Sequence, residues 1–143
     1  KNVKNIVGIK AASGDLSQIA KMMSMADGCL ELYSGNDDQV LPILSLGGLG
    51  VISVLSNVAP KFTHDMVMKY FDGDIKGATE DQLKALPLIN ALFSEVNPIP
   101  VKTAMNLMGM NVGPLRMPLC EMEEDTKAAL AKEIEKFGLK LAK

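Results

Sequence analysis

The sequence predicts an α/β fold in its first half, followed by a helical second half. Three short, largely apolar runs alternate with segments of helical periodicity in the first half. Small or polar residues follow each run and lead into the next helix, which is the order of a βα unit. After residues 72–74 no further strand pattern occurs. We therefore expect two domains, with three βα units in residues 1–73 and helices alone in residues 74–143.

The three predicted strands are rich in branched apolar residues, as expected for strands buried in a parallel sheet. They cover Asn5–Lys10, Cys29–Ser34 and Val51–Leu55. Parallel strands with helices between them require right-handed crossover connections. Such units fit either a doubly wound sheet or part of a (β/α)₈ barrel, and the residues alone leave both architectures open.

A helix is expected after each of these strands, at Asp15–Met25, Asp38–Leu46 and Pro60–Asp72. Asp15 is the expected N-cap of the first helix, because a short acidic side chain can accept a hydrogen bond from the first turn. The apolar spacing of the second helix predicts an inward face, which consists of Val40, Leu41, Leu44 and Ser45.

The second half predicts three further helices, at Asp74–Ser94, Val101–Met108 and Glu123–Phe137. Pro87 lies inside the first of them, so a kink or a break is expected there. The apolar face of that helix is expected to consist of Leu83, Leu86, Ile89, Asn90 and Phe93. An irregular stretch, residues 110–120, separates the last two helices.

Composition argues against two classes of partner. The chain has 143 residues, a net charge of −2 and 4% aromatic residues, without a cluster of Lys and Arg, so we expect no nucleic-acid binding. Its apolar stretches are shorter than a membrane span, and its first residues resemble neither a signal peptide nor a natural start. Cys29 and Cys120 form no paired motif, which favours free thiols and a cytoplasmic location.

Lys10 is the strongest candidate for a catalytic residue. It ends the first predicted strand, and α/β proteins place their chemistry at the carboxyl ends of strands. Burial disfavours an ammonium, so a lysine in apolar surroundings can become a neutral amine near pH 7. A neutral amine attacks a keto group and forms a Schiff base. The alternative is a lysine whose ammonium extends past the strand end into solvent.

The loop after the second strand lies at the same end of the sheet as Lys10. Backbone N–H groups of residues 35–38 could hold a carboxylate, and Asp37 could contact a substrate. Equally, Asp37 or Asp38 could only cap the next helix. The glycine-rich residues 47–50 precede a strand, so we expect a tight turn and not a phosphate-binding loop. His64 has no metal-ligand spacing around it and is expected at an exposed helix position.

Five segments together carry a resemblance to a known family. In order they are Gly8-Ile9-Lys10-Ala11-Ala12-Ser13-Gly14-Asp15, Ser34-Gly35-Asn36-Asp37, Gly47-Gly48-Leu49-Gly50-Val51-Ile52-Ser53-Val54, Asn97-Pro98-Ile99-Pro100-Val101-Lys102 and Leu115-Arg116-Met117-Pro118-Leu119. Over essentially the whole chain they resemble the 4-hydroxy-tetrahydrodipicolinate synthase family, also called dihydrodipicolinate synthase. The Gly-Ile-Lys motif is shared with related class I aldolases such as N-acetylneuraminate lyase, whereas the last two segments point more narrowly to the synthase.

The resemblance implies a (β/α)₈ TIM barrel followed by a helical C-terminal domain, assembled as a homotetramer. The three predicted strands would be strands 6 to 8 of the barrel. Lys10 would form the Schiff base with pyruvate, and the derived enamine would attack L-aspartate 4-semialdehyde in the diaminopimelate route to lysine. Gly35 and Asn36 would line the side of the second substrate, and the main-chain carbonyl of Ile52 would face the pyruvate site. No metal and no organic cofactor would take part.

The chain departs from the family pattern in two respects. Ala11 stands where the family usually has Glu, which alters the charge beside Lys10. A (β/α)₈ barrel needs about 250 residues, so the resemblance leaves the first five strands to an N-terminal half outside this chain. That half would carry the family's catalytic tyrosine, which neither Tyr33 nor Tyr70 matches in position. Two function classes follow: an enzyme portion that needs its N-terminal half as a partner, or a non-catalytic fragment.

Overall fold

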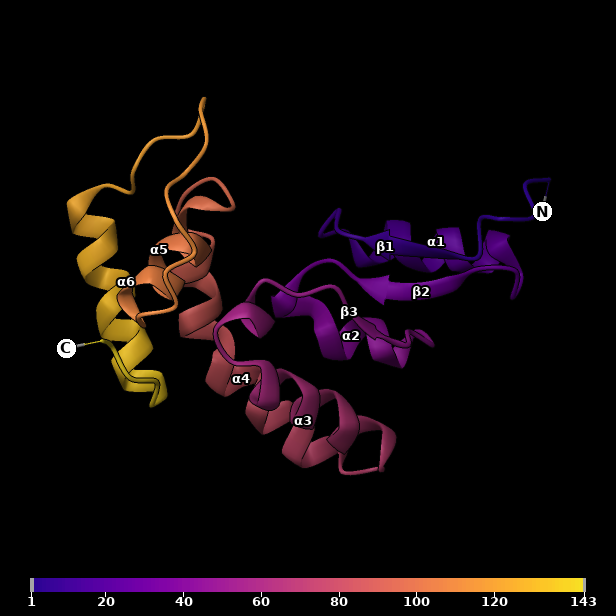
Figure 1. Cartoon of the computed structure of the whole chain (residues 1–143). Coiled ribbons are helices and arrows are strands. Elements are labelled where there is room, and N and C mark those ends of the chain that lie inside the picture. The colour runs from indigo at the N-terminus through magenta and orange to yellow at the C-terminus, as the bar shows by residue number, and fades with distance from the viewer. Residues whose placement is uncertain (1, 143) are drawn as a thin grey trace. The chain divides into compact units, whose positions relative to one another are not determined.

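The computed structural model describes residues 2–142, and its first half contains a three-stranded parallel sheet (Figure 1). The strands are β1 (Gly8–Ala11), β2 (Glu31–Ser34) and β3 (Gly50–Val51), and they lie in that order. The register places Lys10 opposite Tyr33 and Ser34 opposite Val51. The predicted parallel α/β arrangement is therefore confirmed.

The strands are shorter than predicted. A strand forms only where the backbone has a neighbouring strand to pair with, and apolar character alone does not provide one. Residues 4 and 5 form a turn, and β1 begins only at Gly8. The third predicted strand leaves the sheet after Ile52, whose N–H donates to the carbonyl of Ser34 at 2.8 Å. Leu55 belongs instead to the 3₁₀ turn η2 (Leu55–Asn57), where it is fully buried in a helical core.

The helices expected after each strand are present as α1 (Leu16–Ala26), α2 (Val40–Ser45) and α3 (Pro60–Phe71). Asp15 caps α1 as predicted, since its carboxylate accepts the N–H of Gln18 at 3.0 Å. The 3₁₀ turn η1 (Asp37–Gln39) precedes α2. The prediction of an inward Ser45 is wrong: Ser45 is exposed and donates to the carbonyl of Pro42, and Ile43 is buried in its place.

The second half contains α4 (Ile75–Leu92), α5 (Ile99–Leu107) and α6 (Glu124–Phe137), close to the predicted ranges. Helix α4 runs through Pro87 without a break, contrary to one of the two expectations. Proline removes a backbone donor and frees the carbonyl four residues earlier. Both Pro87 and Leu83 are exposed, so water can satisfy that carbonyl.

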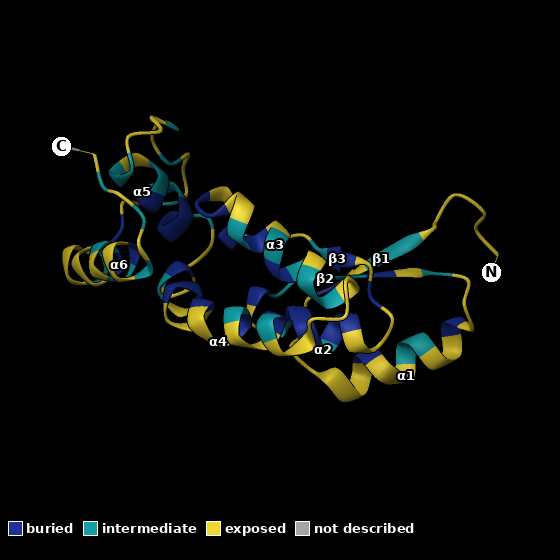
Figure 2. Cartoon of the chain, turned by 90° about the horizontal axis from the view of Figure 1, so that it is seen from below, coloured by how far each residue is buried: buried dark blue, intermediate teal, exposed yellow. Residues whose placement is uncertain are grey.

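The predicted apolar face of α4 is mostly wrong. Of its members only Ile89 is buried, while Leu83 and Phe93 are 64% and 43% exposed. Figure 2 shows buried and exposed stretches alternating along the helix. The buried side is a second stripe that contains small and polar residues, namely Ala78, Gln82, Ala85, Leu88, Ile89 and Leu92. Small residues permit close packing, which a count of large apolar side chains does not detect.

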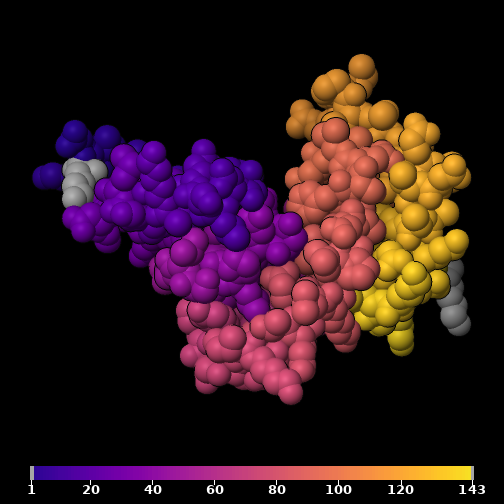
Figure 3. All heavy atoms as spheres, turned by 180° about the vertical axis from the view of Figure 1, so that it is seen from behind, coloured from indigo at the N-terminus to yellow at the C-terminus, as the bar shows by residue number. Residues whose placement is uncertain are grey.

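The chain divides into two compact units, each with its own core. The first unit is the chain up to Ser53 together with Met66–Gln82, and the second is Val54–Asp65 together with the chain from Leu83 onward. Both α3 and α4 contribute to both units. In the second unit α5 and α6 lie side by side, drawn in orange and yellow in Figure 3.

The cores of the two units differ in extent. The first unit has two small buried clusters, one around Ile19 and Leu32 and one around Val40 and Met66. The second unit has one larger cluster from helices α4 to α6 and the η2 turn, which includes the fully buried Leu92. None of the helices within residues 2–142 combines the length and apolar character that a bilayer crossing requires.

Candidate functional site

The carboxyl ends of the three strands bring the predicted site residues of the first unit to one edge of the sheet. Lys10 lies in β1, Gly35 and Asn36 follow β2, and Ile52 follows β3. Because all three strands are parallel, their carboxyl ends meet at the same edge. This edge is the candidate site.

Lys10 and Gly35 are in close proximity. A Cβ atom placed on Gly35 would lie 2.9 Å from Cε of Lys10 and 2.6 Å from Cβ of Ala12. The N–H of Gly35 also donates to the carbonyl of Ala11 at 2.7 Å, which fixes the loop after β2 against β1. Only glycine fits here without displacing the lysine side chain. Packing against Lys10 therefore explains why residue 35 is a glycine.

Ser34 anchors both other predicted residues. Its Oγ donates to the carbonyl of Asn36 at 2.8 Å and accepts the N–H of Asn36 at 3.3 Å. Its carbonyl accepts the N–H of Ile52 at 2.8 Å. Ser34 is fully buried, so these bonds are shielded from competing water. The backbone of Asn36 and Ile52 is thus held from a single strand end.

Asp37 is buried and hydrogen-bonded within the protein, being only 2% exposed. Ser53 Oγ donates to its carboxylate, and Gln82 Nε2 donates to its backbone carbonyl at 2.8 Å. The prediction that Asp37 or Asp38 caps the next helix is wrong, because neither η1 nor α2 has a side-chain cap. Sequence reasoning assigned no role to Ser34, Ser53 or Gln82. The two serines could have been suspected because they are chain neighbours of Gly35 and Ile52, whereas nothing in the sequence around Gln82 indicates its role.

Lys10 itself is exposed, which differs from the buried setting expected for an activated lysine. The physical reason is the position of β1, which is an edge strand in the described sheet and has a strand partner on one side only. The alternative drawn from the sequence, a lysine that extends into solvent, therefore describes the exposure of Lys10 in this chain.

The tight turn at residues 47–50 and the exposed position of His64 agree with the sequence-based expectations. The turn 47–50 is tight, since a Cβ on Gly48 would lie 2.7 Å from the carbonyl oxygen of Ile43. His64 has an exposed side chain beside Asp65, and no cluster of three metal-ligating side chains exists among residues 2–142. Cys29 and Cys120 are both free and exposed.

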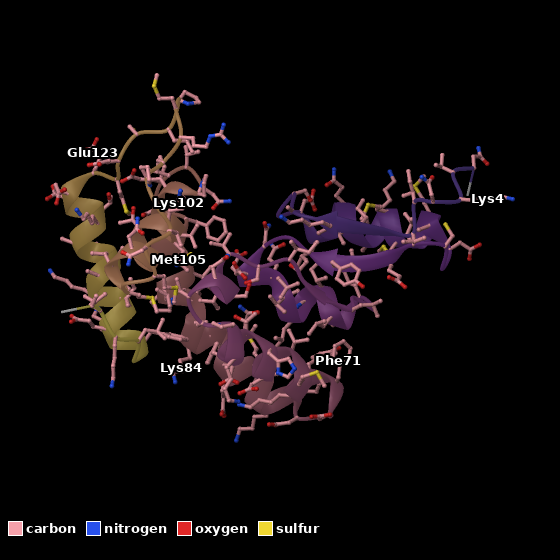
Figure 4. The ribbon with its side chains drawn as sticks, in the orientation of Figure 1. Lys4, Phe71, Lys84, Lys102, Met105 and Glu123 are labelled. Atoms are coloured by element: carbon pink, nitrogen blue, oxygen red, sulfur yellow. The ribbon has the colours of Figure 1, made fainter. Side chains whose placement is uncertain are left out.

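The two motif segments of the second unit meet at a pocket of about 310 Å³. Lys102 of α5, labelled in Figure 4, is the residue of the first motif that reaches this stretch. Its Nζ donates to the carbonyl of Pro114 at 2.6 Å. Asn106 accepts the N–H of Val112 at 2.9 Å and donates to the carbonyl of Gly113 at 3.2 Å. These bonds fix residues 112–114 against α5, which gives Lys102 of the first motif a structural role.

The fold and this edge define a class of protein: parallel βα units that present a lysine at a strand end, followed by a helical carboxyl-terminal part. The model of the dihydrodipicolinate synthetase family matches residues 1–137, and the chain belongs to that family. The resemblance drawn from the five sequence segments is thereby confirmed.

Relatives of known name agree with this assignment. The chain is 58% identical to 4-hydroxy-tetrahydrodipicolinate synthase of Lachnoclostridium phytofermentans, over 96% of this chain and 47% of that protein. It is 56% identical to the synthase of Clostridium perfringens strain SM101, again over 96% and 47%. The chain therefore spans about half the length of these relatives.

Solved structures show the same partial coverage. Dihydrodipicolinate synthase from Thermotoga maritima superposes with a TM-score of 0.92 at 44% identity, over 97% of this chain and 48% of that one. The enzyme from Aquifex aeolicus superposes with a TM-score of 0.94 at 33% identity, over 99% and 48%. The α/β fold of this chain is thus the fold of the corresponding part of these enzymes.

Proposed function

We propose that this chain is the carboxyl-terminal half of a Schiff-base lyase of lysine biosynthesis. The enzyme condenses pyruvate with L-aspartate 4-semialdehyde to give 4-hydroxy-tetrahydrodipicolinate. Lys10 is its nucleophile, Gly35 and Asn36 line the side of the aldehyde, and the carbonyl of Ile52 faces pyruvate. The observation that carries the proposal is the placement of Lys10 at a strand end directly against Gly35, in a chain of this family.

The chemistry begins with the neutral amine of Lys10, which adds to the keto carbon of pyruvate and expels water. The protonated imine withdraws electrons from the adjacent methyl group, which loses a proton and becomes the nucleophilic carbon of an enamine. That carbon forms a bond with the aldehyde carbon of the semialdehyde. Cyclisation then releases the product and returns the lysine amine. No metal and no organic cofactor takes part in this sequence.

The proposal also includes the missing part of the barrel. Strands β1 to β3 are strands 6 to 8 of a (β/α)₈ barrel, residues 1–73 complete that barrel, and residues 74–143 form the helical C-terminal domain. The N-terminal half supplies strands 1 to 5, the proton-relay tyrosine and the groups that bind the pyruvate carboxylate. That half covers the open side of β1 and buries Lys10, so activation of the amine requires both halves. The completed enzyme is a cytoplasmic homotetramer.

Covalent trapping tests the assignment of Lys10. The chain is mixed with the N-terminal half, treated with pyruvate and borohydride, and mapped by mass spectrometry. We expect one reduced pyruvyl group on Lys10, and we expect Lys10→Ala to abolish labelling and lower turnover by orders of magnitude because the covalent route is lost. Lys21→Ala is the matched control, since Lys21 is an exposed lysine on α1. Label that persists at another lysine would refute the assignment.

A further inference from the structure

We propose that Asp37 and Ser53 are positioning residues. The hydrogen bond between their side chains, supported by Gln82, holds the backbone of Asn36 and Ile52 where the substrates bind. This inference rests on the proposed function, in which Asn36 and Ile52 face the two substrates. Asp37, Ser53 and Gln82 are called the polar tie below.

The polar tie joins two buried residues, Asp37 and Gln82, to the half-buried Ser53. Asp37 is 2% exposed and Gln82 is 7% exposed, and both are ordinarily surface residue types. Asp37 begins η1, Ser53 follows β3, and Gln82 lies in α4. Gln82 binds at both ends, since Nε2 donates to the carbonyl of Asp37 and Oε1 accepts the N–H of Leu41 at 3.4 Å.

The members of the tie are direct chain neighbours of the substrate-facing residues. Asp37 follows Asn36, and Ser53 follows Ile52. The bond between Asp37 and Ser53 therefore joins the loop after β2 to the segment after β3 at the point where each approaches the site. Ser34 joins the same two segments: its backbone carbonyl accepts the N–H of Ile52, and its Oγ donates to the carbonyl of Asn36.

A buried carboxylate is a costly way to join two segments, because it must be removed from water. An apolar contact would stabilise the fold at least as well, but it would not fix the direction in which a backbone carbonyl points. Hydrogen bonds are directional, and a displacement of about 1 Å at a reacting group can reduce catalysis by about a hundredfold. A need to position Ile52 and Asn36 precisely explains why a buried aspartate is present at residue 37. A need for stability alone does not explain it.

The test compares variants in the enzyme assembled from this chain and its N-terminal half. Ser53→Ala removes the hydroxyl that donates to Asp37, and Ser53→Thr retains a hydroxyl. Asp37→Ala removes the acceptor, and Asp37→Asn retains an oxygen acceptor of the same size. Asp38→Ala is the control, because Asp38 is the exposed neighbour of Asp37. All measurements are made well below the melting temperature of each variant, so that the folded fraction is the same.

Two readouts separate positioning from stability. We expect Ser53→Ala and Asp37→Ala to lower kcat/KM for the aldehyde by about ten- to a hundredfold, while pyruvate at saturation still labels Lys10. We expect Ser53→Thr and Asp37→Asn to recover most of that loss, and Asp38→Ala to behave as the unsubstituted enzyme. In parallel, hydrogen exchange of the Ile52 amide should accelerate about tenfold in the two alanine variants, because its bond to Ser34 opens more often.

The outcomes distinguish this inference from the proposed function. Ser53→Ala with kcat/KM and Ile52 exchange both within about twofold of the unsubstituted enzyme would overturn the inference. Activity that falls only in proportion to the unfolded fraction would also overturn it. If the unsubstituted enzyme fails to label Lys10, the proposed function fails, and faster Ile52 exchange in Ser53→Ala would still support the tie as the device that holds the strand ends.

Discussion

The two compact units are organised in opposite ways. The first unit has short strands, an open edge on β1 and a partly buried polar tie at the strand ends, and its buried apolar residues fall into two small clusters. The second unit packs helices around one larger apolar cluster. Directional polar bonds fix positions, whereas apolar packing supplies most of the stability. The comparison contrasts a unit whose strand ends are fixed by polar bonds with a unit that is held by apolar packing.

Adding the N-terminal half tests the contrast between the two units most severely, because we expect the largest change in activity from it. The chain alone should show negligible condensation activity, and mixing with the N-terminal half should produce activity, since Lys10 alone neither positions pyruvate nor relays protons. An assay with pyruvate and each of two aldehydes measures both points. The mixture should prefer aspartate semialdehyde to N-acetylmannosamine. Faster turnover of the sugar would place the chain in the lyase branch, and full activity without complementation would refute the need for the second half.

The state of the isolated chain tests the dependence of the first unit directly. Its strands present open edges, and large apolar side chains nearby are exposed, with Val7 at 65% and Met25 at 74%. We expect self-association by sedimentation, and faster hydrogen exchange in β1 than at the fully buried Leu130 and Ile134 of α6. Addition of the N-terminal half should then slow exchange in β1. A sharp cooperative melt from a sedimenting monomer would contradict this expectation.

Gly35→Ala tests a single contact of the first unit, the one between Gly35 and the side chain of Lys10. The new Cβ would approach Cε of Lys10 to 2.9 Å and Cβ of Ala12 to 2.6 Å, so the lysine side chain must move. We expect borohydride labelling of Lys10 to slow by about ten- to a hundredfold in the completed enzyme, as for other small misplacements of a reacting group. Gly28→Ala is the control: its Cβ would meet no atom within 4 Å, and the substitution strains only the backbone, because Gly28 has a φ of +73°. Equal labelling rates for the two variants would refute the packing argument.

The parts of this structure that sequence predicted are those fixed by local interactions. Asp15 caps α1 through a residue three positions away, so a short-range pattern was sufficient. The parts that sequence missed depend on distant partners. Gln82 donates a hydrogen bond to Asp37, which is 45 positions away in the chain. Leu55 packs into the core formed by the helices, although its apolar character suggested a strand. Lys10 was picked out from its position at a strand end, and residues 35–38 from their place at the same edge, whereas the particular roles of Lys10 and Gly35 came only from the family resemblance.

The smallest expected effect concerns Asp65, an aspartate of the second unit that contrasts with Asp37. Lys61 Nζ donates to its carboxylate at 2.6 Å, and this hydrogen bond, with a further one from His64, holds the pKa of Asp65 below its usual value. Because the pKa of Asp65 is lower in the folded than in the unfolded protein, its ion pair stabilises the fold at pH values above the unfolded-state pKa. This stabilisation is lost as the pH falls through the folded-state pKa. Both side chains are largely exposed, with Lys61 at 87%, so that contribution is small.

Lys61→Ala should therefore raise the pKa of Asp65 toward its ordinary value in an NMR titration and leave the melting temperature near neutral pH almost unchanged. The surface lysine Lys76, which lies 3.9 Å from Glu80, is a matched control whose removal should leave Asp65 unaffected. The contrast with Asp37 is the informative part: we expect the same residue type to matter little in an exposed pair and strongly in the polar tie, because water replaces a lost partner only at the surface. A large stability loss in Lys61→Ala would refute the view that the second unit is held by its apolar core.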